Sequence, residues 1–527
     1  MKGARSGWVL WIVPAALLAL GLTAGKAHGP YYWAVNFDPE YCYLVNAVNL
    51  LTFQAPAHTD HPGATLQELT AAVSLARWLA AGLAGEWEPL DRAVLRRPEA
   101  YLHTVNFVLQ LLVFGLLYWA GRRIRAAAGS LWPALVFQAS FLLYHQILLA
   151  QTRVSPEPLL VAAFAALAGF LAPAAARTEA LETPAGLRNA TLAGAVTGFG
   201  VVTKVTFAPM ALLGLALGAR RARRRFYLGL AGAAALLLIP IYGQLPRVAR
   251  WLWDLLIHQG RYGAGETGLP APGALAANLG RLCREEPFLF LLGAFFLAAA
   301  LAAWRRPHLM RPSAAASPLY RLYAAALAGA GLSIVLTAKH YAPHYALPAM
   351  LLTALAGAIF AGLALRRRRE SLAWSAAGVA FAVLFAAGLA YSAGRIPGWF
   401  EAMQQRRVAE ARLESILAPY GRCTVAGIYR SSLPTFALHF GNTFASWRQT
   451  RVLSELYPGV VHYHKFLGHF QSFAYGNQDG RIARRIAAGE CVLLVGERSS
   501  VERVRGFRWE PVGEAAGQLV VRLTGAP

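Results

Sequence analysis

Carboxylates and histidines gather in the segment 36–67, NFDPEYCYLVNAVNLLTFQAPAHTDHPGATLQ, directly after an apolar N-terminal stretch. Asp38 and Glu40 flank Pro39, which imposes extended or turn geometry on the residue before it, and His61 lies in a DHPG turn. Ionisable side chains beside membrane-length apolar stretches are candidates for chemistry, because lipid penalises them elsewhere. We therefore treat Asp38 and Glu40 as candidate catalytic carboxylates and His61 as a candidate ligand contact. Helix capping by the two carboxylates is the alternative.

A second set of charged residues interrupts the apolar stretches further along the chain. Arg153 and Glu157 lie at the junction of two such stretches, in QTRVSPEPLL (151–160), and Lys204 is the lone cation inside a long apolar run. A third group is KHYAPHY, residues 339–345. Because cations at a membrane surface pair well with an anionic phosphate, we expect a phosphate site here. The alternatives are a first-turn role for Glu157 at a helix dipole and snorkelling of Lys204 to the interface.

Together these residues define one candidate site. Its catalytic residues are Asp38, Glu40 and Glu157, its phosphate-binding residues are Arg153, Lys204, Lys339 and His340, and its substrate-binding residues are His61, His258, Arg261, His344 and Tyr345. The sequence has no zinc-type ligand spacing, so no metal ligand and no cofactor are assigned. A divalent cation held by the His/Asp/Glu grouping stays open.

The composition shows which elements must position these residues. Of 527 residues, 57% are hydrophobic and only 14% are charged, which indicates a polytopic membrane protein. The net charge of +24 comes from arginine clusters between apolar runs, a pattern typical of cytoplasmic loops and not of nucleic-acid binding. Apolar runs long enough to cross about 30 Å of hydrocarbon lie near residues 8–24, 104–121, 131–150, 156–173, 226–244, 286–303, 322–338, 344–364 and 371–393.

The region 191–218 is either one long span or two short spans with a break at Lys204. With a cytoplasmic N-terminus, two short spans place every arginine cluster in the cytoplasm, whereas one long span moves the clusters from Arg220 onward to the exterior. We therefore predict about eleven transmembrane helices. In this topology one exterior face holds Asp38, His61, Arg153, Lys204, His258, Arg261, Lys339, His340 and His344.

The predicted chain has two domains. Residues 1–394 form the membrane domain, with long exterior loops at about 25–103 and 245–284, and residues 395–527 form a small exterior α/β domain. Helical spacing in 41–53 and 66–83 predicts amphipathic helices in the first loop, and the glycines and prolines of the second loop predict an irregular segment. In the tail, the runs at 423–430, 490–497 and 518–525 predict strands and 481–489 predicts a helix. Whether Cys423 and Cys491, which begin two of these strands, form a disulfide is left open.

The motifs and their order resemble the GT-C superfamily of membrane glycosyltransferases, in particular its protein mannosyltransferase and aminoarabinose transferase branch. The resemblance rests on FDPEY after the first span, GFGVVTK (198–204) at the break and KHYAPHYALP before a late span. It implies transfer of a sugar, with inversion, from a polyprenyl-phosphate donor to a lipid, glycan or protein acceptor on the exterior face of the bacterial inner membrane. It further implies that Asp38 is the general base, that Glu157 is a second acidic residue, and that Lys204, Lys339 and His340 hold the donor phosphate.

Two other classes of function remain. A polytopic transporter or flippase for a lipid-linked or anionic envelope precursor would also have many spans and intramembrane charges, although the sequence shows no internal repeat. A scaffold for envelope polysaccharide would use the tail as a binding module and would not need Asp38. The sequence indicates neither the sugar, nor the acceptor, nor the oligomeric state.

Overall fold

The chain divides into two compact units, described here one at a time. The computed structural model describes residues 7–60, 63–176, 181–259, 265–268, 270–305, 317–367, 372–465, 467–474 and 476–525. The helical unit comprises Met1–Thr23, Thr59–Leu66 and Val108–Ile396, and the mixed unit comprises Ala24–His58, Gln67–Phe107 and Pro397–Pro527. Two predicted site residues, His61 and Arg261, lie outside the described residues.

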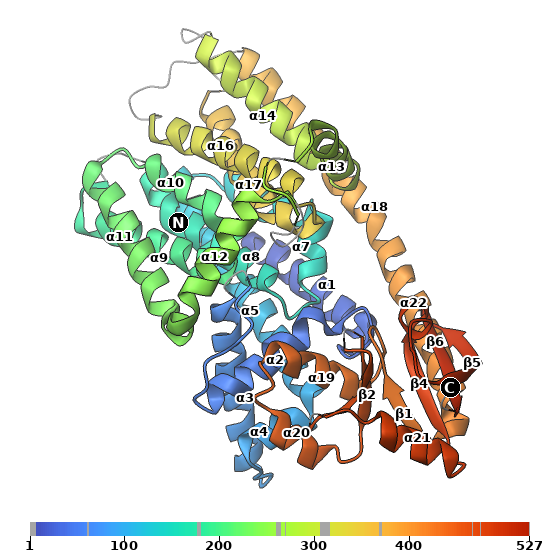
Figure 1. Cartoon of the computed structure of the whole chain (residues 1–527). Helices are drawn as coiled ribbons and strands as arrows, with labels where there is room; N and C mark the ends of the chain where they lie inside the picture. Colours follow the sequence, from blue (N-terminus) through green and yellow to red (C-terminus); the bar gives the residue numbers. More distant parts are fainter. Residues whose placement is uncertain are drawn as a thin grey trace. The chain divides into compact units, whose positions relative to one another are not determined.

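Long apolar helices make up most of the helical unit (Figure 1). They are α1 (Ile12–His28), α5 (Pro98–Ala128), α8 (Pro156–Ala176), α9 (Pro184–Thr203), α11 (Arg220–Leu237), α14 (Pro287–Arg305), α16 (Ser317–Lys339), α17 (Leu347–Arg367) and α18 (Leu372–Leu417), of which α1, α5 and α18 continue past the unit boundary. Within the described residues, six helices are long and apolar enough to cross a membrane, or up to eight if each of two bent helix pairs is one span. The protein is therefore a helical membrane protein, and the count of eleven spans stays a prediction.

Two predicted segments differ from the structure. The run 131–150 is not one helix, because it is broken into α6 (Trp132–Ala139), a 3-10 turn (Ser140–Leu142) and α7 (His145–Ala150). The second exterior loop is not irregular throughout, because it contains α12 (Leu245–Ile257) and α13 (Pro272–Glu285). The glycines and prolines of this loop indicated irregular structure, although WLWDLLI and LAANLGRLC have the apolar spacing of helices.

Backbone contact joins α9 and α11, which lie side by side in Figure 1. A Cβ added at Gly194 of α9 would lie 1.8 Å from the carbonyl oxygen of Phe226, and one at Gly229 of α11 would lie 2.1 Å from that of Thr191. Small residues permit such close approach between helices in a membrane, where packing replaces the hydrophobic effect as the driving force. The glycines of this pair are therefore packing residues.

The break predicted at Lys204 is present. Helix α9 ends at Thr203, Lys204 has extended backbone with φ −160° and ψ 126°, and a 3-10 helix begins at Val205. The reversal that follows is compact, because a Cβ at Gly200 would lie 2.2 Å from the ring of Phe207. The charge distribution along the chain thus located a real interruption of the apolar run.

The mixed unit contains one six-stranded sheet in the order β3-β2-β1-β4-β6-β5 (Figure 1). The strands are β1 (Thr424–Gly427), β2 (Val461–His464), β3 (His469–Ser472), β4 (Val492–Glu497), β5 (Arg508–Ala515) and β6 (Gln518–Gly525). Strand β1 pairs in parallel with β2 and β4, whereas β3, β5 and β6 join by antiparallel pairing. The centre of this sheet is buried on both faces, since alternate residues of β4 belong to two different hydrophobic clusters.

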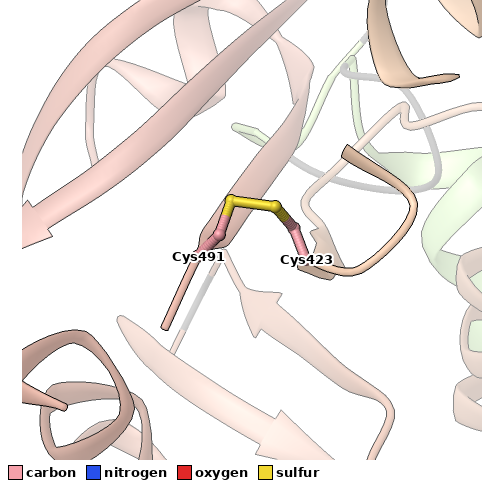
Figure 2. Close-up of a disulfide and its surroundings, with 2 residues drawn as sticks. All are labelled: Cys423 and Cys491. Carbon is pink, nitrogen blue, oxygen red and sulfur yellow. A yellow bond between two sulfur atoms is a disulfide. The ribbon is translucent and has the colours of Figure 1, made fainter. Parts of the chain in front are cut away.

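Adjacent parallel strands also explain a disulfide. Cys423 and Cys491 precede Thr424 and Val492, which are register partners in β1 and β4. The two cysteines are bonded, with a Cα–Cα distance of 4.7 Å (Figure 2). The disulfide that the sequence left open is therefore present, and it fastens the start of the sheet.

Several helices of the mixed unit precede the sheet in the sequence or lie between its strands. They include α2 (Phe37–Leu51), α4 (Leu90–Arg96), α19 (Pro434–Phe444), α20 (Thr450–Leu456) and α21 (Asp479–Ala487). Helices α2 and α3 (Ala64–Leu83) confirm the two amphipathic helices predicted in the first loop.

Buried amides join α2 to the tail of the chain. Asn46 donates to the carbonyl oxygen of Phe444 (3.2 Å) and Asn49 to that of Ala445 (3.2 Å). A Cβ at Gly441 would lie 2.6 Å from the carbonyl oxygen of Tyr41, so α2 and α19 touch through their backbones. Part of the first loop and the tail therefore form a single folded body, which the sequence did not predict.

Candidate functional site

The helical unit contains a cavity with a volume of about 600 Å³. Its walls are mostly apolar and come from α12, α16 and the segment after Lys204, with Leu252, Leu256 and Leu336 among the lining residues. Cationic and hydrogen-bonding side chains also line it, among them Arg281, Lys339, His340, Tyr341, His344 and Tyr345. This combination suits a ligand with a long apolar part and an anionic group.

Lys339 and His340 are placed by the end of α12. The Lys339 ammonium donates to the carbonyl oxygens of Leu255, at 3.0 Å, and of Leu256, and His340 Nε2 lies 2.7 Å from the Leu255 carbonyl oxygen. A helix C-terminus has unpaired carbonyl groups and partial negative charge, so it attracts cations. The two side chains are thus fixed at the cavity wall, and their predicted role as phosphate ligands stays a prediction.

A buried ion pair lies beside the residues that line the cavity. The Lys204 ammonium donates to Glu157 Oε1 at 2.6 Å, and the side chains are 4% and 11% exposed. The same ammonium lies 4.8 Å from the ring centroid of Tyr345, which lines the cavity. Glu157 also interacts electrostatically with His344, and His344 with Arg153. Five predicted site residues thus form one cluster in the helical unit, namely Arg153, Glu157, Lys204, His344 and Tyr345.

Pairing changes the chemistry open to Lys204 and Glu157. A buried ammonium and carboxylate at this distance neutralise each other, and neither keeps a full charge for a ligand. Extended backbone at Lys204 and the first turn of α8 at Glu157 bring the two side chains together. Arg153 and Lys204 stay predictions as direct phosphate ligands, and Glu157 stays a prediction as a catalytic residue.

His258 is not among the lining residues of the cavity. It ends α12, and its Nδ1 lies 3.1 Å from the carbonyl oxygen of Asp254. Its predicted contact with substrate stays a prediction.

Asp38 and Glu40 belong to the mixed unit. Asp38 is exposed and has extended backbone (φ −108°, ψ 116°) before Pro39, as expected for a residue that precedes proline. Glu40, by contrast, is fully buried in the first turn of α2. The exposed carboxylate of Asp38 is the better placed of the two to accept a proton from a ligand.

Glu99 holds the chain on both sides of Asp38. Its carboxylate accepts hydrogen bonds from the backbone N–H groups of Tyr31 (2.8 Å) and Tyr32 (3.0 Å) and from the hydroxyl of Tyr41 (2.7 Å). Burial, followed by the Glu99 charge, raises the pKa of Tyr41 well above its ordinary value, so the phenol remains a donor. Sequence reasoning missed this positioning residue, because Glu99 after Pro98 looks like any first-turn glutamate.

Arg281 is a second residue that sequence reasoning missed. It comes from α13, lines the cavity and lies 5.0 Å from the ring centroid of Tyr341. The helical spacing of LAANLGRLC was the available signal, since it places Arg281 on a helix and not in an irregular loop. Within the described residues, no group of three or more His, Cys, Asp or Glu side chains could hold a metal ion.

The architecture defines a helical membrane protein with a small α/β part. No protein-family model matches the sequence, and no curated protein is significantly similar to it. Its structure is similar to that of the aminoarabinose transferase ArnT from Cupriavidus metallidurans in the apo state, with a TM-score of 0.51, 13% identity and 100% of both chains covered. ArnT bound to undecaprenyl phosphate gives a TM-score of 0.49, 14% identity and 98% coverage of each chain. The chain therefore has an ArnT-like fold, the fold class that its motifs predicted.

Proposed function

We propose that this protein is a membrane glycosyltransferase that takes a sugar from a polyprenyl-phosphate donor. The cavity of the helical unit carries this proposal, because it combines a long apolar wall with Arg281, Lys339 and His340 in about 600 Å³. A polyprenyl chain would lie along the leucines, and the phosphate would pair with the cations. The GT-C fold and the sequence motifs support the same donor class.

In the proposed reaction, a hydroxyl oxygen of the acceptor attacks the anomeric carbon of the donor sugar. The bond from that carbon to the phosphate oxygen breaks with inversion, and polyprenyl phosphate leaves with the electron pair. Asp38 takes the proton of the attacking hydroxyl. Lys339, His340 and Arg281 stabilise the charge that develops on the leaving phosphate. The Lys204–Glu157 pair holds Tyr345 and His344 at the cavity wall.

We place the reaction on the exterior side of the bacterial inner membrane, with the N-terminus in the cytoplasm. The Cys423–Cys491 disulfide supports an exterior mixed unit, because disulfides persist in oxidising compartments. The acceptor class is a lipid, a glycan or a protein of the envelope.

Sugar transfer tests the proposal directly. Purified protein is incubated with radiolabelled sugar on extracted polyprenyl-phosphate donors and with envelope fractions as acceptors. Wild type should transfer label, whereas Asp38→Asn should lose transfer almost completely and still insert into the membrane. Asp91→Asn, a matched change in the first turn of α4, should behave as wild type. Equal transfer by Asp38→Asn and wild type would remove Asp38 as the base.

A transporter or flippase is the second candidate, favoured by the broken helices. The helix pairs Arg220–Leu237 with Ile239–Ile257 and Pro272–Glu285 with Pro287–Ala302 bend by 74° and 101°, and discontinuous helices are common in transporters. Reconstitution in liposomes separates the two functions. Movement of labelled lipid-linked precursor between leaflets without formation of a glycosylated product would favour the transporter.

A further inference from the structure

The mixed unit has a pocket of its own, of about 230 Å³, at the carboxyl ends of its parallel strands. Its lining includes Tyr463, Lys465, Gly468, Ser500, Arg503 and Arg505, which we call the basic pocket. The lining residues follow the carboxyl ends of β1, β2 and β4, the three parallel strands. From β1 the chain passes to β2 and β3 on one side and then crosses to β4 on the other. Open α/β sheets bind ligands where the strand order reverses in this way.

The charge of the basic pocket is positive. Lys465, Arg503 and Arg505 line it, and no carboxylate is among the lining residues that the structure describes. The glutamates nearest in sequence have other partners, since Glu497 lies 3.9 Å from Arg430 and Glu502 lies 3.4 Å from Arg498. Asp479 interacts electrostatically with Tyr463 of the pocket, and the three lining cations outnumber this carboxylate.

A buried hydroxyl gives a second, independent indication of a ligand. Ser500 lines the pocket, is 2% exposed, and its Oγ has no hydrogen-bond partner in the described part of the chain. A buried hydroxyl without a partner costs free energy. A ligand oxygen in the pocket would supply the missing partner. Tyr463 gives the pocket an aromatic wall. The ammonium of the lining residue Lys465 lies 4.0 Å from the ring centroid of Tyr429, beside the pocket.

We propose that the basic pocket binds a phosphate group. Two arginines and a lysine supply planar and point-charge donors for the phosphate oxygens, and Ser500 supplies a hydroxyl. The group is either free inorganic phosphate or the phosphate of a small organic molecule such as a sugar phosphate, and the two sources share this chemistry. The site lies wholly within the mixed unit and does not depend on the proposed transferase reaction.

Calorimetric titration of the full-length protein in detergent, in chloride buffer, tests this site without requiring any transfer activity. The probes are inorganic phosphate, hexose 6-phosphate and the uncharged hexose. Phosphate-bearing probes should bind to wild type in a saturable way, and the uncharged hexose should not. Tighter binding of hexose 6-phosphate than of inorganic phosphate would support an organic phosphate as the ligand, and equal or weaker binding would support the free anion.

Matched variants locate the binding. Arg503→Gln/Arg505→Gln should weaken binding by about tenfold or more, as expected for the loss of charge-assisted hydrogen bonds. Arg508→Gln removes a charge at an exposed position in β5, outside the pocket, and should bind as wild type. Because Arg503 and Arg505 are exposed, the double variant should keep the thermal stability of wild type. Absence of saturable binding to wild type, or equal weakening in the double variant and Arg508→Gln, would overturn the proposal.

Discussion

The Lys204–Glu157 ion pair permits a quantitative test of how a buried charge pair serves this fold. Its atoms are 2.6 Å apart and its side chains are 4% and 11% exposed, so removal of one partner leaves the other as an uncompensated buried charge. Such a loss costs about 3–5 kcal/mol, whereas replacement of both partners by neutral groups of similar size is close to neutral. We therefore expect Lys204→Met and Glu157→Gln each to destabilise by that amount, and the double variant to recover most of it.

The free energy of unfolding in mixed detergent micelles, followed by tryptophan fluorescence, gives the coupling energy of the pair. A double-mutant cycle should yield a coupling of at least about 2 kcal/mol. The matched control is the pair Arg485–Glu490, which has the same 2.6 Å distance but side chains that are 32% and 48% exposed. Its coupling should be below about 1 kcal/mol. Additive effects of Lys204→Met and Glu157→Gln would refute the reasoning.

Transfer activity of the same variants separates positioning from phosphate binding. If the pair only holds Tyr345 and His344, the stable double variant retains a measurable part of wild-type transfer, and this is the expected result. Complete loss of transfer in a stable double variant would instead indicate a direct role, of Lys204 at the donor phosphate or of Glu157 in catalysis.

Three further predictions concern packing, pH and the disulfide. A Cβ at Gly194 would lie 1.8 Å from a backbone oxygen, so Gly194→Ala should lower the yield of folded protein and its thermal stability, whereas Gly232→Ala, with open space around it, should do neither. Burial, with a smaller effect of His464, lowers the pKa of His439 to about 3, and burial lowers that of His462 well below its ordinary value. Below pH 6.5 the unfolded chain binds a proton at each of these histidines and the folded chain does not. The free energy of unfolding should therefore fall by about 1.4 kcal/mol for each histidine per pH unit below pH 6.5. In denaturant titrations at pH 7, 6 and 5, the free energy of unfolding of His439→Phe should change less with pH than that of wild type. Cys423→Ser/Cys491→Ser opens a loop with a sequence separation of 68 residues and should lower the free energy of unfolding by about 2–4 kcal/mol in the same titrations, while Cys283→Ser should have little effect.

The sequence predicted features that follow from local pattern or from charge. Periodicity located α2 and α3, apolar β-branched runs located β4 and β6, and the arginine distribution located the break at Lys204. The motifs together predicted an ArnT-like fold. Each of these signals lies within a short stretch or is summed along the whole chain. Such signals can be used without knowing which distant residues come into contact.

Features that depend on long-range pairing could not be predicted. Lys204 and Glu157 were both expected near a ligand. Their ion pair with each other depends on a contact between residues that are 47 positions apart. Glu99 carries no local sign that it receives three hydrogen bonds from the chain around Asp38. The strands β2 and β5 were missed because VHYH and RWEPVGEA mix polar residues into short runs, and they are stabilised by sheet neighbours.

The hydrogen bond from Asn46 to Phe444 joins residues that are 398 positions apart. During synthesis, this bond cannot form until the second residue has left the ribosome. At ribosomal rates of about 5–20 residues per second, the partner of Asn46 emerges roughly 20–80 seconds after Asn46 itself. During that interval, the face of α2 that later meets α19 has no partner from the tail. The N-terminal loop therefore cannot complete its packing until α19 has been translated. A chain that stops after α18 can never form these contacts.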